Sequence, residues 1–507
     1  MSGKVYLVGA GPGDPGLVTI KGMELIRKAD CIVYDRLLSP ELLWYSRADC
    51  ECIYVGKEDR HHTIPQEEIN ELLVEKAKRY HCVVRLKGGD PYVFGRGAEE
   101  ALYLREHGIP FAVVPGVSSS IAGAAYAGIP VTHRGLATGF RVITAHNRKD
   151  EMPDMDFPSM LDVRETLVFL MGLSKVGEIA KGLLSAGRKA DTPVAVIAHA
   201  TLMSQQVCVG TLCDIAQKVG ERQLTSPAII VVGDVVQLHT ALQFFEQRPL
   251  WGRRYLVPKI GKEPSRISLL LREKGARVQE CMVGQLVGIP AHYTVQELKQ
   301  VDILLFTSKN GVDYFMRNLF SSGLDVRAVS HMKFAVIGQK TAEQLKTYGL
   351  SADLMPEHAH GEALAKEFQE YIEHTFSGNP FRRIAVWYPT ARNAKDQLVD
   401  TLLSFCDCGR LDVYENQPFV PEENDPFEIP NPEEWNDFDG ILFTCASSAE
   451  RLLGGVPAEQ LASFLAQTTI YSIGPKCSLE LTKLGVSPVV EAAVCSYEGL
   501  LNTLLHG

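Results

Sequence analysis

Short apolar runs alternate with amphipathic segments along the first half of the chain. The segments 19–28 and 65–79 carry apolar residues at helical spacing, and the second opens with Pro65, which suits the first turn of a helix. The apolar runs have the length and β-branched content of buried strands; they are Lys4–Val8, Cys31–Tyr34, Cys52–Val55 and Cys82–Leu86. This alternation predicts an α/β fold with layers around mostly parallel sheets.

The second half of the chain contains an internal repeat. The run Asp302–Ser308 returns as Asp439–Cys445, and Ala335–Lys340 returns as Tyr471–Lys476. Each copy places an apolar strand before a polar turn and a helix. One spacing kept across several segments predicts two similar α/β lobes within residues 253–507, with a cleft between them.

Three polar segments mark expected boundaries. Residues 147–159 are polar and contain two prolines, which predicts a division of the N-terminal part. Residues 246–254 are charged and contain a proline between a predicted helix and a predicted strand, which indicates a linker over 247–252. Residues 418–434 are rich in proline and acidic residues, which predicts an exposed loop.

Composition and charge narrow the function classes. The 507 residues carry a formal net charge of −10, and the pI is about 5.8, which disfavours a general nucleic-acid binder. No apolar run approaches the roughly 18 residues that cross a bilayer, and the start of the chain has no signal-peptide pattern. The 12 cysteines occur singly or as C-x-C, which predicts reduced, mostly buried thiols. We therefore expect a cytoplasmic protein without nucleic-acid or membrane partners.

Glycine- or serine-rich loops follow three of the predicted strands. Within the second loop, Gly88 and Gly89 allow positive φ and close packing of a flat ligand, and Asp90 offers acceptors for hydroxyl or amine groups. Loops at successive strand ends of an α/β domain indicate a ligand cleft. The three loops are Gly9–Gly16, Lys87–Gly97 and Val114–Ser120.

A nicotinamide-dependent dehydrogenase is an alternative for the first loop. Strand, glycine turn and helix are the order of a dinucleotide-binding motif, with Asp30 or Asp35 as the ribose acid. Pro12 and Pro15 count against this alternative, because they remove amide donors that a pyrophosphate needs. A purely structural turn is the other alternative.

Narrow motifs extend over residues 1–246. They are the loop 9–16, Ala29–Asp30, Tyr34–Leu37, Val55–Lys57, Ile64–Asn70, the loop 84–97, Tyr126–Arg134, Phe169–Gly172 and Pro227–Gly233. By these motifs the segment resembles the uroporphyrinogen III C-methyltransferases of the tetrapyrrole methylase family. The resemblance implies a two-lobed fold, with S-adenosylmethionine between lobes of about 1–135 and 136–246.

The same resemblance implies roles for individual residues. Asp35 and Lys57 become the acid–base candidates; their alternatives are a helix-capping carboxylate and a solvated lysine. Contacts with S-adenosylmethionine are implied for Pro12, Gly88, Gly89, Asp90, Val93, Ser118, Ser119, Met171 and Ala200. The substrate carries eight carboxylates, which favours fork-shaped cationic donors around the cleft, although each cation could instead be a solvated surface residue. The substrate-binding candidates are Arg36, Arg60, His62, Arg96 and Arg134.

The chain departs from the pattern of this family in two places. Ala198–Thr201 stands where the family usually has Glu-Asn-Gly-Thr, which affects the expected adenine pocket around Ala200. Glu58–Arg60 makes the rim of the cleft more acidic. His61 and His62 have no cysteine or acidic ligand at metal spacing, so we expect no metal.

Residues 253–507 are similar to uroporphyrinogen-III synthases. The supporting motifs are Phe306–Val312, Ile337–Ala342, Gly361–Leu364, Val413–Tyr414, Phe443–Ser448 and Ile473–Pro475. The similarity implies one lobe of about 253–286 plus 416–507, another of about 287–415, and two strands that cross between them. It makes Tyr414 the candidate that assists departure of the substrate hydroxyl. Groups that would hold substrate carboxylates, or alternatively cap helices, are Thr307, Ser308, Lys340, Ser447 and Lys476.

Together the two resemblances imply a bifunctional enzyme of tetrapyrrole biosynthesis. It would close hydroxymethylbilane into uroporphyrinogen III with inversion of the D ring. It would then methylate this product at C2 and C7 with S-adenosylmethionine, giving precorrin-2. The first family also implies a homodimer through the methyltransferase half. A non-catalytic tetrapyrrole-binding protein built from degenerate lobes is a further alternative.

Overall fold

The computed structural model describes most of the chain, and four of the predicted site residues lie outside the described part: Arg36, Lys57, Arg60 and His62. It describes residues 3–35, 38–47, 49–56, 64–146, 152–261, 263–356, 361–376, 383–394, 402, 404–420 and 427–506, with the backbone only at 361–365 and 458. Two compact units are present. The first holds Met1–Pro258, Lys262–Cys281 and Pro430–Gly507, and the second holds Lys259–Gly261 and Met282–Ile429.

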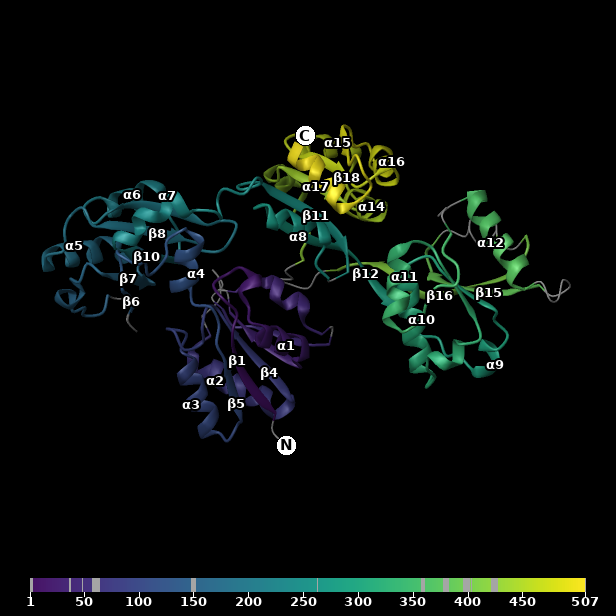
Figure 1. Ribbon diagram of the computed structural model, residues 1–507, viewed down its shortest axis with the longest axis horizontal. Helices are drawn as coiled ribbons and strands as arrows, with labels where there is room; N and C mark the ends of the chain where they lie inside the picture. The colour runs from purple at the N-terminus through teal and green to yellow at the C-terminus, as the bar shows by residue number, and fades with distance from the viewer. Residues whose placement is uncertain are drawn as a thin grey trace. The chain divides into compact units, whose positions relative to one another are not determined.

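The first unit opens with a five-stranded parallel sheet of order β3-β2-β4-β1-β5 (Figure 1). Its strands are β1 (Lys4–Gly9), β2 (Cys31–Tyr34), β3 (Glu51–Tyr54), β4 (Cys82–Lys87) and β5 (Phe111–Val114). The connecting helices are α1 (Ile20–Lys28), α2 (Gln66–Arg79), α3 (Gly97–Glu106) and, after β5, α4 (Ser119–Tyr126). The sequence placed β2 without error, β1, β4, α1 and α2 with an error of one residue at one end, and β3 with a shift of one residue at both ends.

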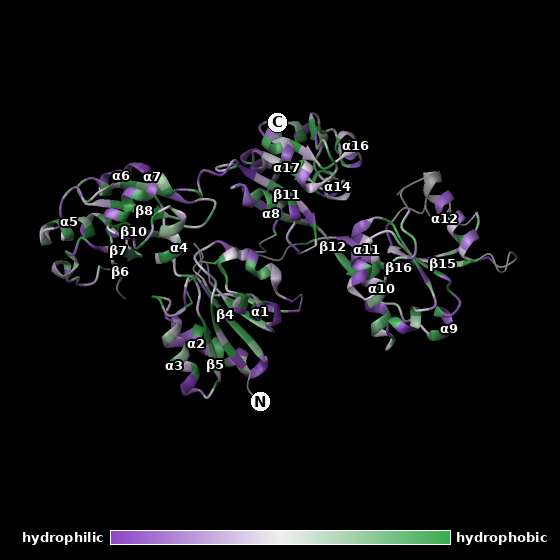
Figure 2. Ribbon diagram, in the orientation of Figure 1, coloured by the Kyte–Doolittle hydropathy of each residue, from purple (hydrophilic) through white to green (hydrophobic). Residues whose placement is uncertain are grey.

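Helices cover both faces of this sheet. Leu73 of α2 and Leu104 of α3 pack with Leu7 on one face, whereas Ile26 of α1 packs with Ile32 on the other. Figure 1 shows α2 and α3 beside the sheet on one side and α1 on the other, and Figure 2 shows hydrophobic strands between helices with hydrophilic outer faces. Burial on both faces explains why these strands appear in the sequence as uninterrupted apolar runs.

The second sheet of this unit is mainly antiparallel, so the prediction of mostly parallel sheets is wrong here. Its order is β6-β7-β10-β8-β9, and β10 pairs antiparallel with β7 and with β8. The last strand, β10, lies between β7 and β8, which run in the same direction. β9 pairs antiparallel with the other edge of β8. The strands are β6 (Gly139–Thr144), β7 (Glu165–Leu170), β8 (Pro193–Ala198), β9 (Gln206–Thr211) and β10 (Ala228–Val232); the helices are α5 (Val176–Ala186), α6 (Ile215–Arg222) and α7 (His239–Leu242).

The second unit contains a sheet of order β14-β13-β15-β16-β12, in which β12 is antiparallel to β16. Its strands are β12 (Arg277–Gly288), β13 (Ile303–Phe306), β14 (Lys333–Val336), β15 (Ala385–Ala391) and β16 (Asp407–Pro418). Its helices are α9 (Val295–Leu298), α10 (Lys309–Ser321), α11 (Gln339–Thr347) and α12 (Gly361–Thr375). The chain passes from one unit to the other within β11 and within β12.

The C-terminal part of the first unit repeats this pattern with parallel strands β11 (Arg254–Ile260), β17 (Gly440–Phe443), β18 (Thr469–Ser472) and β19 (Val489–Glu491). Its helices are α8 (Arg266–Glu273), α14 (Ala446–Leu453), α15 (Ala458–Phe464), α16 (Pro475–Lys483) and α17 (Tyr497–His506). The repeated aspartate has the same role in both copies. Asp302 Oδ2 accepts the Ala385 amide at 3.0 Å, and Asp439 Oδ2 accepts the Arg254 amide at 2.8 Å.

The expected linker and the segment expected to be an exposed loop each contain a buried apolar side chain. Leu250, inside the expected linker, lies in a core cluster with Val257 and Leu271. In the described part of 418–434, Phe427 is buried and its carbonyl accepts the Met282 amide at 3.0 Å. Apolar side chains in a proline-rich segment can anchor it to a core, which composition alone does not show.

All twelve cysteines lie in the described part and none is in a disulfide there, but burial is less general than predicted, since Cys52, Cys213 and Cys495 are exposed. In the described ranges, no helix combines the length and the apolar character needed to cross a membrane.

Candidate active site

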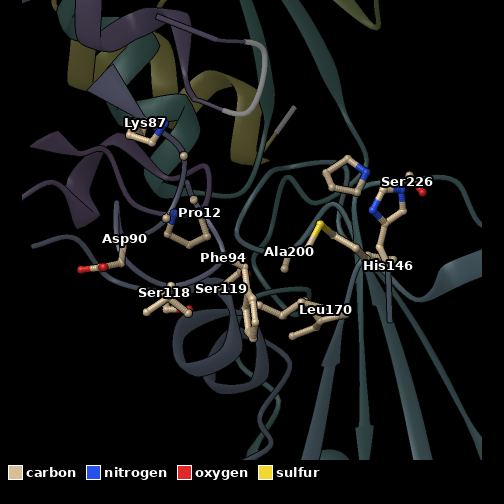
Figure 3. Close-up of a pocket in the computed structure, with 18 of the residues that line it drawn as sticks. Pro12, Lys87, Asp90, Phe94, Ser118, Ser119, His146, Leu170, Ala200 and Ser226 are labelled. Carbon is tan, nitrogen blue, oxygen red and sulfur yellow. The ribbon is translucent and has the colours of Figure 1, made fainter. Parts of the chain in front are cut away.

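A cavity of about 700 Å³ opens in the first unit, where the strand ends of its first two sheets face each other. The nine residues predicted to contact the cofactor all line it: Pro12, Gly88, Gly89, Asp90, Val93, Ser118, Ser119, Met171 and Ala200. In Figure 3, Pro12, Asp90 and the two serines lie on one side of the cavity, and His146 and Ser226 lie on the other. Asp35 and Arg96 line the same cavity.

Glycines bring the three predicted loops together. A Cβ at Gly9 would lie 2.5 Å from the Cα of Gly116, and a Cβ at Gly116 would overlap the carbonyl oxygen of Gly89. Gly89 itself has φ +66°, in the left-handed region. The close approach of these backbones therefore requires glycine at positions 9 and 116, and the left-handed φ favours glycine at position 89.

Asp90 joins two of the loops. Its Oδ1 accepts the Tyr92 amide at 2.8 Å, and its Oδ2 accepts the Gly116 amide at 3.0 Å. The carboxylate therefore holds the shape of the cavity wall. Each oxygen keeps further acceptor capacity for a ligand hydroxyl or amine.

Three residues that line the cavity have a positive φ, which residues other than glycine rarely adopt. Phe94, Arg96 and Met171 have φ values of 54°, 58° and 57°. Strained backbone of this kind clusters at ligand-binding sites, where the surrounding fold enforces it. Val93 and Met171 are also partly exposed apolar side chains on this surface.

A buried charge cluster that was not predicted from the sequence forms one wall of the cavity. Glu100 Oε1 accepts from Lys87 Nζ at 2.8 Å, from Arg85 Nε at 3.2 Å and from Gln66 Nε2 at 3.2 Å. Arg85 Nη2 donates to Asp35 Oδ2 at 3.2 Å. Side-chain exposure is 4% for Arg85, 5% for Lys87 and 0% for Glu100.

The sequence contained one signal for this cluster. Arg85 and Lys87 are two residues apart in β4, the central strand of the first sheet, so both point to the face covered by α2 and α3. Two cations in a strand buried on both faces require an anionic partner. Glu100 is that partner, but only the fold shows which carboxylate supplies it.

Burial lowers the pKa of Lys87, and the neighbouring Arg85 lowers it further, while Glu100 and Asp35 oppose the shift. A lysine of this kind at a cavity wall is typical of functional sites, although structural ion pairs show such shifts too.

The other predicted methyltransferase residues are placed less favourably. Arg96 lines the cavity, but its side chain is 49% exposed and pairs with Glu99 at 2.7 Å. Arg134 is exposed and does not line the cavity. Lys57, Arg36, Arg60 and His62 lie outside the described residues, so their roles stay predictions.

The segment 198–201, which departs from the family pattern, still reaches the cavity. Ala200 lines it, between His199 at φ 48° and Thr201 at φ 68°. The His199 ring Nε2 lies 2.9 Å from Thr225 Oγ1, and Thr201 Oγ1 accepts the Asp14 amide at 3.0 Å. These contacts join the segment to its neighbours without the residues usual in the family.

The lining fits a nucleoside-containing methyl donor. A Cβ at Gly89 would lie 4.0 Å from the Cα of Ser118, so the glycine leaves a cradle open between two loops. Leu170, Ile197 and Pro227 provide apolar surface for a base, and Asp90 provides acceptors for sugar hydroxyls. Within the described residues, no three His, Cys, Asp or Glu side chains gather so as to hold a metal ion.

In the second unit, hydroxyl groups gather beside the end of β13. Tyr414 OH lies 3.4 Å from Ser308 Oγ, and Tyr314 stacks on the Tyr414 ring with centroids 5.2 Å apart. Thr307 Oγ1 lies 3.3 Å from Tyr388 OH. Burial raises the pKa of Tyr414, so its hydroxyl stays protonated above the usual range.

The remaining synthase candidates are distributed as follows. Lys340 is exposed in the first turn of α11, in the second unit. Ser447 lies in α14 of the first unit, 3.4 Å from the Cys445 sulfur, and Lys476 is exposed in the first turn of α16. Ser308 is also the N-cap of α10, where its Oγ accepts the Gly311 amide at 3.0 Å. The helix-capping alternative therefore applies to Ser308, beside its contact with Tyr414.

Comparison with known proteins assigns both halves. The family model "Tetrapyrrole (Corrin/Porphyrin) Methylases" matches residues 4–216, and the model for uroporphyrinogen-III synthase matches residues 265–502. A porphyrin biosynthesis protein HemD from Ruminiclostridium josui is 36% identical over 509 residues, covering 99% of this chain and 98% of the relative. The chain belongs to both families. It joins a tetrapyrrole methylase to a uroporphyrinogen-III synthase.

Two further relatives are uroporphyrinogen-III C-methyltransferases by name, and the longer of the two alignments covers more than one half of this fusion. A uroporphyrinogen-III C-methyltransferase from Methanocaldococcus jannaschii is 52% identical over 239 residues, which is 47% of this chain and 98% of the relative. One from Bacillus subtilis is 43% identical over 358 residues, covering 70% of this chain and 74% of the relative. The fusion is thus a bifunctional enzyme of tetrapyrrole biosynthesis, and the dehydrogenase alternative is set aside.

Proposed function

We propose that the protein closes hydroxymethylbilane to uroporphyrinogen III and then methylates this ring at C2 and C7, giving precorrin-2. The methyl donor is S-adenosylmethionine. The methyltransferase occupies residues 1–246 and the synthase residues 253–507. The observation that carries the proposal is the single cavity lined by all nine predicted cofactor residues together with Asp35.

The methyltransferase residues have three tasks. Gly88, Gly89 and Asp90 hold the donor against the Ser118–Ser119 loop, with Met171 and Ala200 on the opposite wall. The bound donor supplies an electrophilic methyl group on a sulfonium. The nucleophile is an electron-rich pyrrole carbon of the substrate, so holding the two reactants in line provides most of the acceleration. Asp35 then accepts the proton that the methylated ring loses.

The synthase residues need little acid–base strength. Loss of the substrate hydroxyl is assisted by a neutral hydrogen-bond donor, and Tyr414 is buried, protonated and close to Ser308. Thr307, Ser308 and Lys340 offer donors for acetate and propionate groups in the second unit, and Ser447 and Lys476 offer them in the first.

A product assay tests both activities on the full chain. Purified protein receives hydroxymethylbilane under anaerobic conditions, with and without S-adenosylmethionine, and products are identified by mass spectrometry and isomer analysis. We expect the type III ring without the donor and a gain of two methyl groups with it. Only the type I ring, which forms spontaneously, would contradict the synthase assignment. Supplied uroporphyrinogen III that stays unmethylated would contradict the methyltransferase assignment and favour a binding protein.

Tyr414→Phe is expected to slow ring closure by about 10- to 100-fold, because the hydroxyl that assists departure of water is lost while the ring stack on Tyr314 is kept. Methylation of supplied uroporphyrinogen III is the internal control and should not change. Type III ring formation at the wild-type rate would remove Tyr414 from the mechanism.

A further inference from the structure

The buried cluster at the cavity wall has an unusual distribution of hydrogen bonds. Three donors, from Lys87, Arg85 and Gln66, meet one oxygen of Glu100, its Oε1. Its other oxygen, Oε2, is buried and has no hydrogen-bond partner among the described residues. A buried carboxylate oxygen left without a donor costs free energy. A carboxylate held only for stability would be better satisfied at both oxygens.

Arg85 links Glu100 to a residue of the proposed reaction, Asp35. Its Nε is held by Glu100, and its Nη2 reaches Asp35, the proton acceptor in the proposed function. Its Nη1 donates to the backbone carbonyls of Val33 and Leu86. The planar guanidinium is thus fixed on all sides, and it transmits a fixed orientation to the Asp35 carboxylate.

Lys87 completes the balance of charge. Arg85 and Lys87 are cations, and Glu100 and Asp35 are anions, so the four side chains can compensate one another. Lys87 Nζ and Arg85 Nε both donate to Oε1 of Glu100. Because Lys87 shares this oxygen, Arg85 does not form a two-point contact with Glu100, and its Nη2 donates to Asp35 instead.

We propose that Glu100 is a positioning residue of the methyltransferase site, which through Arg85 sets the orientation of the Asp35 carboxylate toward the substrate. The inference rests on the proposed function and deepens it. Glu100 does not itself line the cavity, whereas Asp35, Arg85 and Lys87 do. It therefore acts on the rate of the chemical step and not on binding.

A pair of variants separates positioning from structural support. Glu100→Leu leaves Arg85 and Lys87 buried without their anion, so its melting temperature should fall. In Lys87→Met/Glu100→Leu one cation and one anion are removed together, which should restore much of the stability. We expect kcat for methylation of uroporphyrinogen III to stay about 10- to 100-fold low in both variants. In Glu100→Leu, KM and the affinity for S-adenosylhomocysteine should stay within about threefold, because Glu100 does not line the cavity.

The matched control is Glu106→Gln, an exposed carboxylate at the end of the same helix, which should leave stability and kcat unchanged. A stable double variant with wild-type kcat would overturn the inference and leave a structural role only. If the double variant does not fold, Arg85→Lys replaces it. A single ammonium cannot span Glu100 and Asp35 as the guanidinium does, so the same loss of kcat is expected, and wild-type kcat would overturn the inference. A wild-type chain that does not methylate at all would contradict the proposed function, and the inference would fall with it.

Discussion

Asp35→Asn is expected to lower kcat for methyl transfer by about 100- to 10,000-fold, the range that a positioned proton acceptor contributes. Asparagine has the size of aspartate but cannot accept the proton, and its amide group cannot form the ion pair of 3.2 Å with Arg85. The affinity for S-adenosylhomocysteine, measured by calorimetry, should change by less than about twofold, because Asp35 belongs to the chemical step.

Two controls accompany this variant. Asp49→Asn changes a carboxylate whose side chain is 70% exposed, and it should leave methylation unchanged. Ring closure of hydroxymethylbilane by the same preparation shows that the chain is folded and active elsewhere. A kcat for Asp35→Asn within threefold of wild type would remove Asp35 as the proton acceptor and favour its helix-capping alternative.

Gly116→Ala is expected to abolish detectable binding of S-adenosylhomocysteine, with a rise in Kd of at least about 100-fold. The new Cβ would lie 2.7 Å from the Cα of Gly9 and would overlap the carbonyl oxygen of Gly89. These are backbone atoms, so two of the loops that form the cavity must separate. The free energy of unfolding should fall by about 1–3 kcal/mol, as for other overpacked sites. Calorimetry and denaturant unfolding measure the two effects.

The matched control for this variant is Gly220→Ala. Gly220 lies in α6, is exposed and has no atom within 4 Å of the added Cβ. The replacement should stabilise the helix by about 0.5–1 kcal/mol and leave binding unchanged. Normal binding in Gly116→Ala would show that the three loops tolerate separation and that their close contact is not needed for the donor.

The strands β1, β2 and β4 were predictable because each is largely an apolar run whose residues are mostly buried. A strand such as β2 has apolar residues on both faces, and an amphipathic helix such as α2 has them at every third or fourth position. Local sequence is enough to show these patterns. The antiparallel course of β10 was not predictable in this way, since its apolar run is the same whichever way it pairs.

The amino-acid sequence by itself determined the α/β class, the repeat of the second half and the loops that line the cavity. These depend on periodicity, on glycine positions and on motifs, all of which are local. Only the tertiary structure decided that Arg85, Lys87 and Asp35 share one network through Glu100, and that Leu250 and Phe427 are buried. Such contacts join residues far apart in the chain, and their energy depends on distance and burial, which no local pattern contains.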